Sequence, residues 1–154
     1  MTADDVVAAL ATRHETVATC ESLTGGLVVA ELTSVPGSSA VVRGGLVTYA
    51  TDLKTSLAAV PPDLIAAYGV VSRPVAEAMA EGARAACGAT WGIGLTGVAG
   101  PDPVDGLAPG TVCIAVAGPA GARSVQELFA GDRSAVRAQT VERALALLSG
   151  AWTR

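Results

Sequence analysis

The chain has 154 residues, of which 51% are hydrophobic and 3% aromatic, and its net charge is −4. This length suits one domain with one sizeable core, so we expect residues 1–154 to form a single domain. An acidic balance without a basic run argues against nucleic-acid binding. The acidic start, Met1–Asp5, and the lack of a long apolar run exclude a signal peptide and a membrane span, so we expect a cytoplasmic protein.

The first half of the chain alternates helices with strands. In chain order, we expect a helix at 3–13, a strand at 16–20, a helix at 25–32, a loop at 35–39, a strand at 45–49 and a short helix that carries Lys54.

The second half ends in a hairpin and a helix. We expect a short helix from Pro62, a helix from Ser72 to about Gly88, a strand at 91–96, a loop at 97–110, paired strands at 111–117 and 123–129, and a helix from Asp132. This order predicts an α/β fold, a single three-layer α/β/α domain with a mixed β-sheet.

The histidine and cysteine content argues against a metal site or a disulfide framework. The chain has one histidine, His14, which we interpret as a surface residue. Its three cysteines, Cys20, Cys87 and Cys113, show no CxxC spacing. Cys113 lies in an apolar strand and is best interpreted as a small buried hydrophobe. We therefore expect no metal and no cofactor.

Three expected strand ends lead into loops rich in Gly, Ser and Thr, at 21–26, 49–54 and 96–102. Ligand sites in open α/β sheets gather at the carboxyl ends of the strands. Each loop taken alone is explained equally well as an ordinary turn. Three of them in one small domain favour a shared cleft.

Ser22 and Lys54 are the candidate nucleophile and base of such a cleft. Ser22 precedes the helix entry at Gly25-Gly26, where free backbone N–H groups can stabilise an oxyanion, although Ser22 or Thr24 would also serve as a helix cap. Lys54 is the only lysine among ten basic residues. A buried lysine can act as a base and an arginine cannot, but composition alone leaves a surface lysine equally plausible.

Six ordered motifs between Ala3 and Leu148 resemble the CinA C-terminal domain, also known as the nicotinamide-nucleotide amidase family. They are Glu21–Gly26, Val35–Ser39, Gly44–Tyr49, Lys54, Gly69–Ser72 and Thr96–Pro101. The resemblance implies a stand-alone Ser–Lys amidohydrolase that converts nicotinamide mononucleotide to nicotinic acid mononucleotide and ammonia.

The resemblance also implies roles for individual residues. Ser22 matches the nucleophile and Lys54 the base, while Tyr49 and Thr96 match active-site positions and Arg137 a substrate-binding arginine. We expect the oxyanion near the amides of Thr24, Gly25 and Gly26, and the substrate or its phosphate near Gly97, Arg137 and the amides of Gly37, Ser38 and Ser39.

One departure leaves alternatives open. The loop at 103–110 lacks a lysine that the family usually carries before its Gly-Thr-Val segment. The chain is then either an amidase for nicotinamide mononucleotide or a related carboxamide nucleotide, or a CinA-like binding module with little turnover. The expected partner is a small nucleotide, with no nucleic acid or membrane, and self-association as a homo-oligomer stays open.

Overall fold

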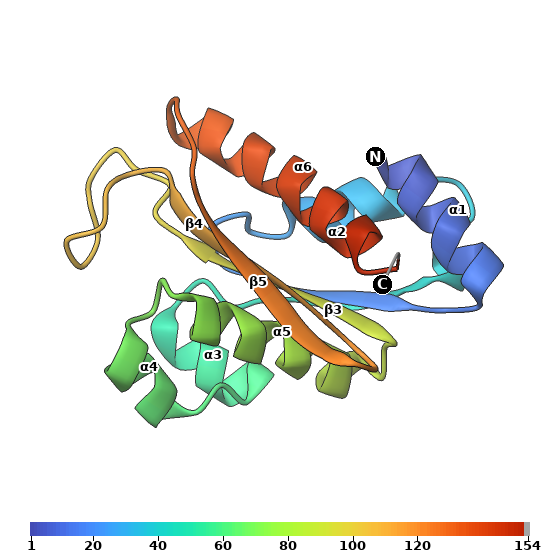
Figure 1. Cartoon of the computed structure of the whole chain (residues 1–154), viewed down its shortest axis with the longest axis horizontal. Coiled ribbons are helices and arrows are strands. Elements are labelled where there is room, and N and C mark those ends of the chain that lie inside the picture. The colour runs from blue at the N-terminus through green and yellow to red at the C-terminus, as the bar shows by residue number, and fades with distance from the viewer. Residues whose placement is uncertain (153–154) are drawn as a thin grey trace.

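A five-stranded mixed β-sheet lies between two layers of helices (Figure 1). The structure is a computed structural model that describes residues 1–152. In the strand order β2-β1-β3-β4-β5, β1 runs parallel to β2 and β3, and β4 runs antiparallel to β3 and β5. The strands are β1 (Val17–Glu21), β2 (Val42–Val47), β3 (Trp91–Gly97), β4 (Thr111–Gly118) and β5 (Gly121–Leu128). The expected α/β fold with a mixed sheet is confirmed.

The helices divide between the two faces of the sheet, as Figure 1 shows. One face carries α1 (Ala3–Arg13), α2 (Leu27–Thr33) and α6 (Arg133–Gly150), and the other carries α3 (Thr51–Ala58), α4 (Pro62–Tyr68) and α5 (Arg73–Cys87). A 3₁₀ turn, η1 (Ser38–Ala40), follows α2. Among residues 1–152, no helix combines the length and the apolar character needed to cross a membrane.

Glycines in β3 allow α5 to lie directly on the sheet. A Cβ atom at Gly92 would lie 2.0 Å from the Ala80 carbonyl oxygen, and one at Gly94 would lie 2.2 Å from that of Ala76. The alternate residues of β3, among them Ile93 and Leu95, are buried in the cluster formed with α1, α2 and α6. The two faces of one strand are therefore covered in different ways, by backbone contact and by large apolar side chains.

The sequence-based boundaries of β2 were wrong. The strand begins at Val42 and ends at Val47, whereas the apolar pattern predicts 45–49. Because glycine is disfavoured in strands, the sequence pattern did not indicate that the strand begins before Gly45. Gly45 is nevertheless required there, because a Cβ atom would lie 2.6 Å from the Thr19 hydroxyl. Tyr49 lies beyond the strand, where the chain turns into α3.

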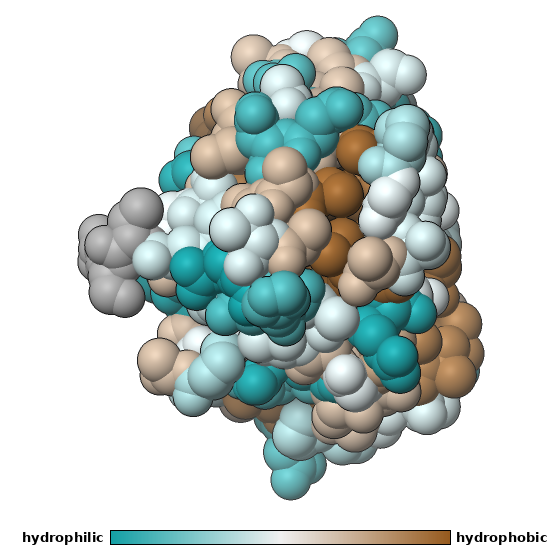
Figure 2. Space-filling view, turned by 90° about the vertical axis from the view of Figure 1, so that its right-hand side faces the viewer, coloured by the Kyte–Doolittle hydropathy of each residue, from teal (hydrophilic) through white to brown (hydrophobic). Residues whose placement is uncertain are grey.

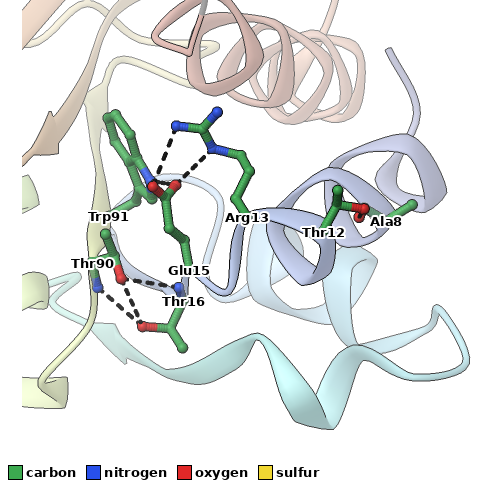
Figure 3. Close-up of polar contacts among 7 residues, drawn as sticks. All are labelled: Ala8, Thr12, Arg13, Glu15, Thr16, Thr90 and Trp91. Carbon is green, nitrogen blue, oxygen red and sulfur yellow. Dashed lines mark hydrogen bonds and ion pairs between the residues drawn. The ribbon is translucent and has the colours of Figure 1, made fainter.

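Polar contacts fix the amino ends of β1 and β3 to each other, at the right of Figure 1 (Figure 3). The Glu15 carboxylate accepts hydrogen bonds from Trp91 Nε1 at 2.6 Å and from Arg13 Nε at 2.8 Å. Thr16 and Thr90 each donate a backbone N–H to the other's hydroxyl, at 3.1 and 3.0 Å. Figure 2 views the molecule from this end and shows hydrophobic surface in a strip between hydrophilic groups.

Glu15→Gln is expected to lower the free energy of unfolding at neutral pH by about 1–2 kcal/mol. The hydrogen bond from Arg13, and then that from Trp91, holds the pKa of Glu15 below its usual range. A carboxyl group whose pKa is lower in the folded state stabilises the fold above its unfolded pKa. That contribution disappears as the pH falls through the folded value, so urea titrations of the two proteins should converge in acid.

The matched control is Glu81→Gln, which removes an exposed helical ion pair with Arg84. It should change the free energy of unfolding by less than about 0.5 kcal/mol. An undiminished Glu15→Gln effect in acid would mean that shape, rather than charge, accounts for the loss.

Candidate active site

A cleft of about 460 Å³ lies at the carboxyl ends of the three parallel strands, the end from which the long loop after β3 extends at the left of Figure 1. Its lining includes Ser22, Tyr49, Lys54, Thr96 and Gly97. The structure therefore brings together five of the residues singled out from the sequence, although they come from three separate segments of the chain.

Glu21, which the sequence analysis did not single out, holds the Ser22 turn. Its carboxylate is fully buried and accepts four hydrogen bonds of 2.7–3.0 Å. The donors are the hydroxyls of Thr19 and Thr24 and the backbone N–H groups of Val28 and Val29. The carboxylate thus caps α2 from the preceding strand. The sequence did contain a signal for this role of Glu21. It is an acidic residue in an apolar strand, just before the Gly-Gly entry into a helix.

Lys54 is buried with its amine beside Ser22. Its side chain is 1% exposed, and Nζ lies 3.2 Å from Ser22 Oγ, 2.7 Å from the Thr48 carbonyl oxygen and 3.4 Å from that of Tyr49. Burial lowers the pKa of Lys54. None of the ion pairs within residues 1–152 involves this lysine. Nζ is placed to donate to Ser22 Oγ and to both carbonyl oxygens; when the amine is neutral, its two N–H groups suffice for the two carbonyl oxygens and its lone pair can accept the Ser22 hydroxyl.

Backbone N–H groups next to Ser22 are available to a ligand. The Gly25 N–H donates to the Ser22 carbonyl at 3.0 Å, so it is already engaged. The N–H groups of Leu23, Thr24 and Gly26 have no acceptor within the described part of the chain. Gly25 and Gly26 both have positive φ angles, which this tight entry into α2 requires. Of these residues only Leu23 lines the cleft, so its N–H is the oxyanion donor that the geometry suggests.

Thr96 supports the wall of the cleft. Its buried hydroxyl donates to the Val70 carbonyl at 2.9 Å and so holds the segment before α5 in place. Apolar side chains, among them Val71 and Val98, line the cleft beside it. The cleft consequently combines a polar floor with an apolar wall, as small-molecule sites usually do.

Two arginines of α6 occupy different positions. Arg137 donates to the carbonyl groups of Leu23 and Thr24, at 3.0 and 3.4 Å, and does not line the cleft. Arg133 lines it, and donates to the Gly100 carbonyl at 2.8 Å and to the Tyr49 hydroxyl at 2.9 Å. Residues four apart lie on the same face of a helix, so the sequence pattern alone does not distinguish the two.

The Gly37, Ser38 and Ser39 segment does not reach the cleft of its own chain. It precedes β2, which runs parallel to β1, so the chain passes η1 at the end of the sheet opposite Ser22. The Ser38 hydroxyl is directed to the Thr33 carbonyl, at 3.4 Å.

The loop that departs from the family pattern forms a small hairpin. Val104 and Leu107 exchange backbone hydrogen bonds of 3.2 and 2.8 Å around Asp105 and Gly106, both of which have positive φ. This is the geometry of a two-residue primed turn, which strongly favours Asp-Gly. Val104 lines the cleft. The hairpin therefore contributes an apolar side chain to the rim of the cleft.

His14 and Cys113 lie apart from this chemistry, whereas the buried Cys20 thiol contacts the Thr48 hydroxyl at 3.4 Å, close to Lys54. Within residues 1–152, no three His, Cys, Asp or Glu side chains are grouped as metal ligands. His14 is exposed at the end of α1. Cys113 is buried in β4, and burial raises the pKa of its thiol to about 11. A protonated, inaccessible thiol behaves as a small hydrophobe.

The fold and the cleft define an α/β domain with a buried serine–lysine pair at the carboxyl ends of its parallel strands. The family model for the CinA C-terminal domain matches residues 1–151, and the chain belongs to this family.

Relatives and solved structures agree with this assignment. CinA-like proteins from Anaeromyxobacter dehalogenans and Frankia casuarinae are 53% and 46% identical over 94% and 93% of the chain. These matches cover 36% and 33% of those proteins, so the chain spans about a third of their length. The structure of competence/damage inducible protein CihA from Agrobacterium tumefaciens has a TM-score of 0.92 at 33% identity, over 96% of this chain and 92% of that one. A CinA superfamily protein from Klebsiella pneumoniae gives 0.93 at 31% identity, over 96% and 93%.

Proposed function

We propose that this domain hydrolyses the carboxamide of nicotinamide mononucleotide to nicotinic acid mononucleotide and ammonia, through an acyl-enzyme on Ser22. The observation that carries the proposal is the 3.2 Å contact between Ser22 Oγ and the buried Lys54 amine. The resemblance to the nicotinamide-nucleotide amidase family supplies the substrate. The fully buried Glu21 supports the proposal further, because it holds the serine turn.

Each step of the reaction has a group suited to it. Neutral Lys54 accepts the Ser22 proton while Oγ attacks the carboxamide carbon. The backbone N–H of Leu23, which lines the cleft beside Ser22, stabilises the oxyanion. The Lys54 ammonium returns the proton to the leaving nitrogen, and ammonia departs. Lys54 then deprotonates a water molecule, which hydrolyses the ester and frees Ser22.

The nucleotide phosphate requires a cation, and Arg133 is the arginine that lines the cleft. Its guanidinium is held by Gly100 and Tyr49, which keeps it oriented at the entrance. An oriented guanidinium binds phosphate through paired hydrogen bonds. We therefore assign the phosphate to Arg133, whereas the sequence analysis assigned it to Arg137.

Arg133→Ala should raise KM for nicotinamide mononucleotide by roughly 10- to 100-fold with little change in kcat, the loss of a charge-assisted contact. Nicotinamide riboside, which lacks the phosphate, should be converted equally by this variant and the wild type. Arg137→Ala is the matched comparison. It should act through the Ser22 turn, and so lower kcat for both substrates. A KM effect specific to the phosphate in Arg137→Ala alone would restore the assignment made from the sequence.

The activity should rise with pH as Lys54 loses its proton. Burial lowers the pKa of this lysine, and only the neutral amine can accept the Ser22 proton. The profile of kcat/KM should therefore have an ascending limb whose midpoint lies below the ordinary pKa of lysine. A flat profile through neutral and mildly alkaline pH would contradict the assignment of Lys54 as the base.

The deciding experiment measures ammonia release from nicotinamide mononucleotide by the purified chain, with a chelator present and without nucleoside triphosphate. Product should form under these conditions. The loop at 103–110, which lacks the lysine that the resemblance implies, favours one alternative: a CinA-like module that binds a nucleotide without turning it over. Calorimetric binding without product would support that alternative.

A further inference from the structure

The charged side chains that line the candidate cleft are few and of both signs. Among its lining residues in the described part of the chain, Asp102 is the only acid, and Lys54 and Arg133 are the only basic residues. Lys54 acts as the base in its neutral form, so an entering substrate meets one negative and one positive side chain. The proposed reaction uses Arg133 for the phosphate and gives Asp102 no role.

The Asp102 carboxylate is not neutralised by a neighbouring cation. None of the ion pairs within residues 1–152 involves this residue, whose side chain is exposed. Arg133, the guanidinium at the same cleft, donates instead to the Gly100 carbonyl at 2.8 Å and to the Tyr49 hydroxyl at 2.9 Å. Both charges are therefore available to a ligand.

The wall that carries Asp102 is fixed to the sheet and to α6. It directly continues β3 along the side of the cleft. Val98 forms backbone hydrogen bonds of 2.8 and 2.7 Å with residues 110–111, which closes the base of the loop. The Gly100 carbonyl, two residues before Asp102, accepts the hydrogen bond from Arg133. The backbone of the acid thus keeps a defined position relative to the guanidinium.

We propose that the Asp102 carboxylate attracts the positively charged pyridine ring of the substrate, and that the domain thereby selects carboxamide nucleotides with a cationic ring over those with a neutral ring. This inference rests on the proposed function, which brings such a ring into the cleft. Nicotinamide mononucleotide carries a positive ring and a negative phosphate on either side of one ribose. Asp102 and Arg133 provide the complementary pair of charges.

A cationic ring requires a countercharge in this cleft. Against the apolar side chains of Val71 and Val98 the ring loses part of its hydration, which is unfavourable for a cation unless an opposite charge replaces the water. Without Asp102, the remaining full charge would be that of Arg133, which repels a cation. Coulomb attraction decreases slowly with distance, so the carboxylate acts on the delocalised ring charge without a direct hydrogen bond. A neutral ring gains nothing from it.

The test compares dissociation constants, measured by calorimetry in a Ser22→Ala background so that no ligand is hydrolysed. The two ligands are nicotinamide mononucleotide and its reduced form, whose dihydropyridine ring is uncharged but keeps the carboxamide, ribose and phosphate. Asp102→Asn preserves the size of the side chain and removes its charge. It should weaken binding of the oxidised nucleotide by roughly five- to tenfold, and that of the reduced nucleotide by less than about twofold. The ratio of the two effects isolates the interaction between carboxylate and ring charge.

Asp105→Asn is the matched control in the same loop. Asp105 is exposed and does not line the cleft, and asparagine readily adopts its positive φ. This variant removes the same charge and should change each dissociation constant by less than about twofold, because salt screens exposed charges. Asp102→Glu, which keeps the charge, should retain the preference for the oxidised nucleotide.

An equal loss for both nucleotides in Asp102→Asn would overturn the proposal, because the carboxylate would then bind the ribose or the carboxamide. An equal effect of Asp105→Asn would also overturn it, since only the overall charge would matter. Ammonia release by the wild type together with either result would uphold the proposed function and reject the ring selectivity. Selective binding of the oxidised nucleotide without ammonia release by the wild type would do the reverse.

Discussion

Replacing Ser22 by alanine should lower kcat by roughly 10³-fold or more, because the acyl-enzyme then has no oxygen on which to form. Lys54→Arg should lose a comparable factor. Arginine keeps a positive charge but cannot release a proton at working pH. The double variant should be little worse than either single one, since both residues act in the same proton transfer. Initial rates of ammonia release, with circular dichroism to verify folding, measure these effects.

Ser56→Ala is the matched control for the serine variant. Ser56 is exposed on α3, two residues after Lys54, and its replacement should leave kcat unchanged. Near-normal turnover in Lys54→Arg would mean that the residue acts only as a charge and that a water molecule or Tyr49 is the base. Retained activity in Ser22→Ala would refute the covalent mechanism itself.

Glu21→Gln should lower the free energy of unfolding by roughly 2–4 kcal/mol, the range for a buried group left with unsatisfied partners. The carboxylate accepts four hydrogen bonds, two of them from the first turn of α2. An amide places an N–H₂ group against donors that need an acceptor. The Ser22 turn should shift as a result, so kcat should fall as well.

Glu31→Gln, on the exposed side of the same helix, is the control and should alter neither quantity appreciably. Urea titration and initial rates, taken on the same preparations, separate the two effects of Glu21→Gln. A variant that unfolds more easily yet turns over normally in its folded state would show that Glu21 stabilises α2 without positioning Ser22.

Site residues at the carboxyl ends of strands could be predicted from the sequence. Ser22 and Tyr49 follow strands and Thr96 lies at the end of one, and parallel strands end on the same side, so their convergence followed from topology. The role of Arg133 depends on packing between distant elements, and that of Glu21 depends on the conformation of the turn between β1 and α2. Choosing between Arg133 and Arg137 requires the angle at which α6 crosses the sheet, which periodicity does not contain. The four donors of Glu21 all lie within residues 19–29, but the sequence does not show that the turn after β1 folds them around one carboxylate.

Because of the glycines of β3, the two helix layers of this domain differ in the amino-acid substitutions that they can accommodate. On the side of α1, α2 and α6, large aliphatic side chains meet, and exchanges that conserve volume can be accommodated by repacking. On the side of α5, Gly92 and Gly94 touch carbonyl groups, and even one added methyl group would displace a helix. Thr96 continues that strand into the cleft. Sequence drift in such domains should therefore concentrate in the aliphatic layer, while the glycine-lined layer stays nearly invariant over the same divergence.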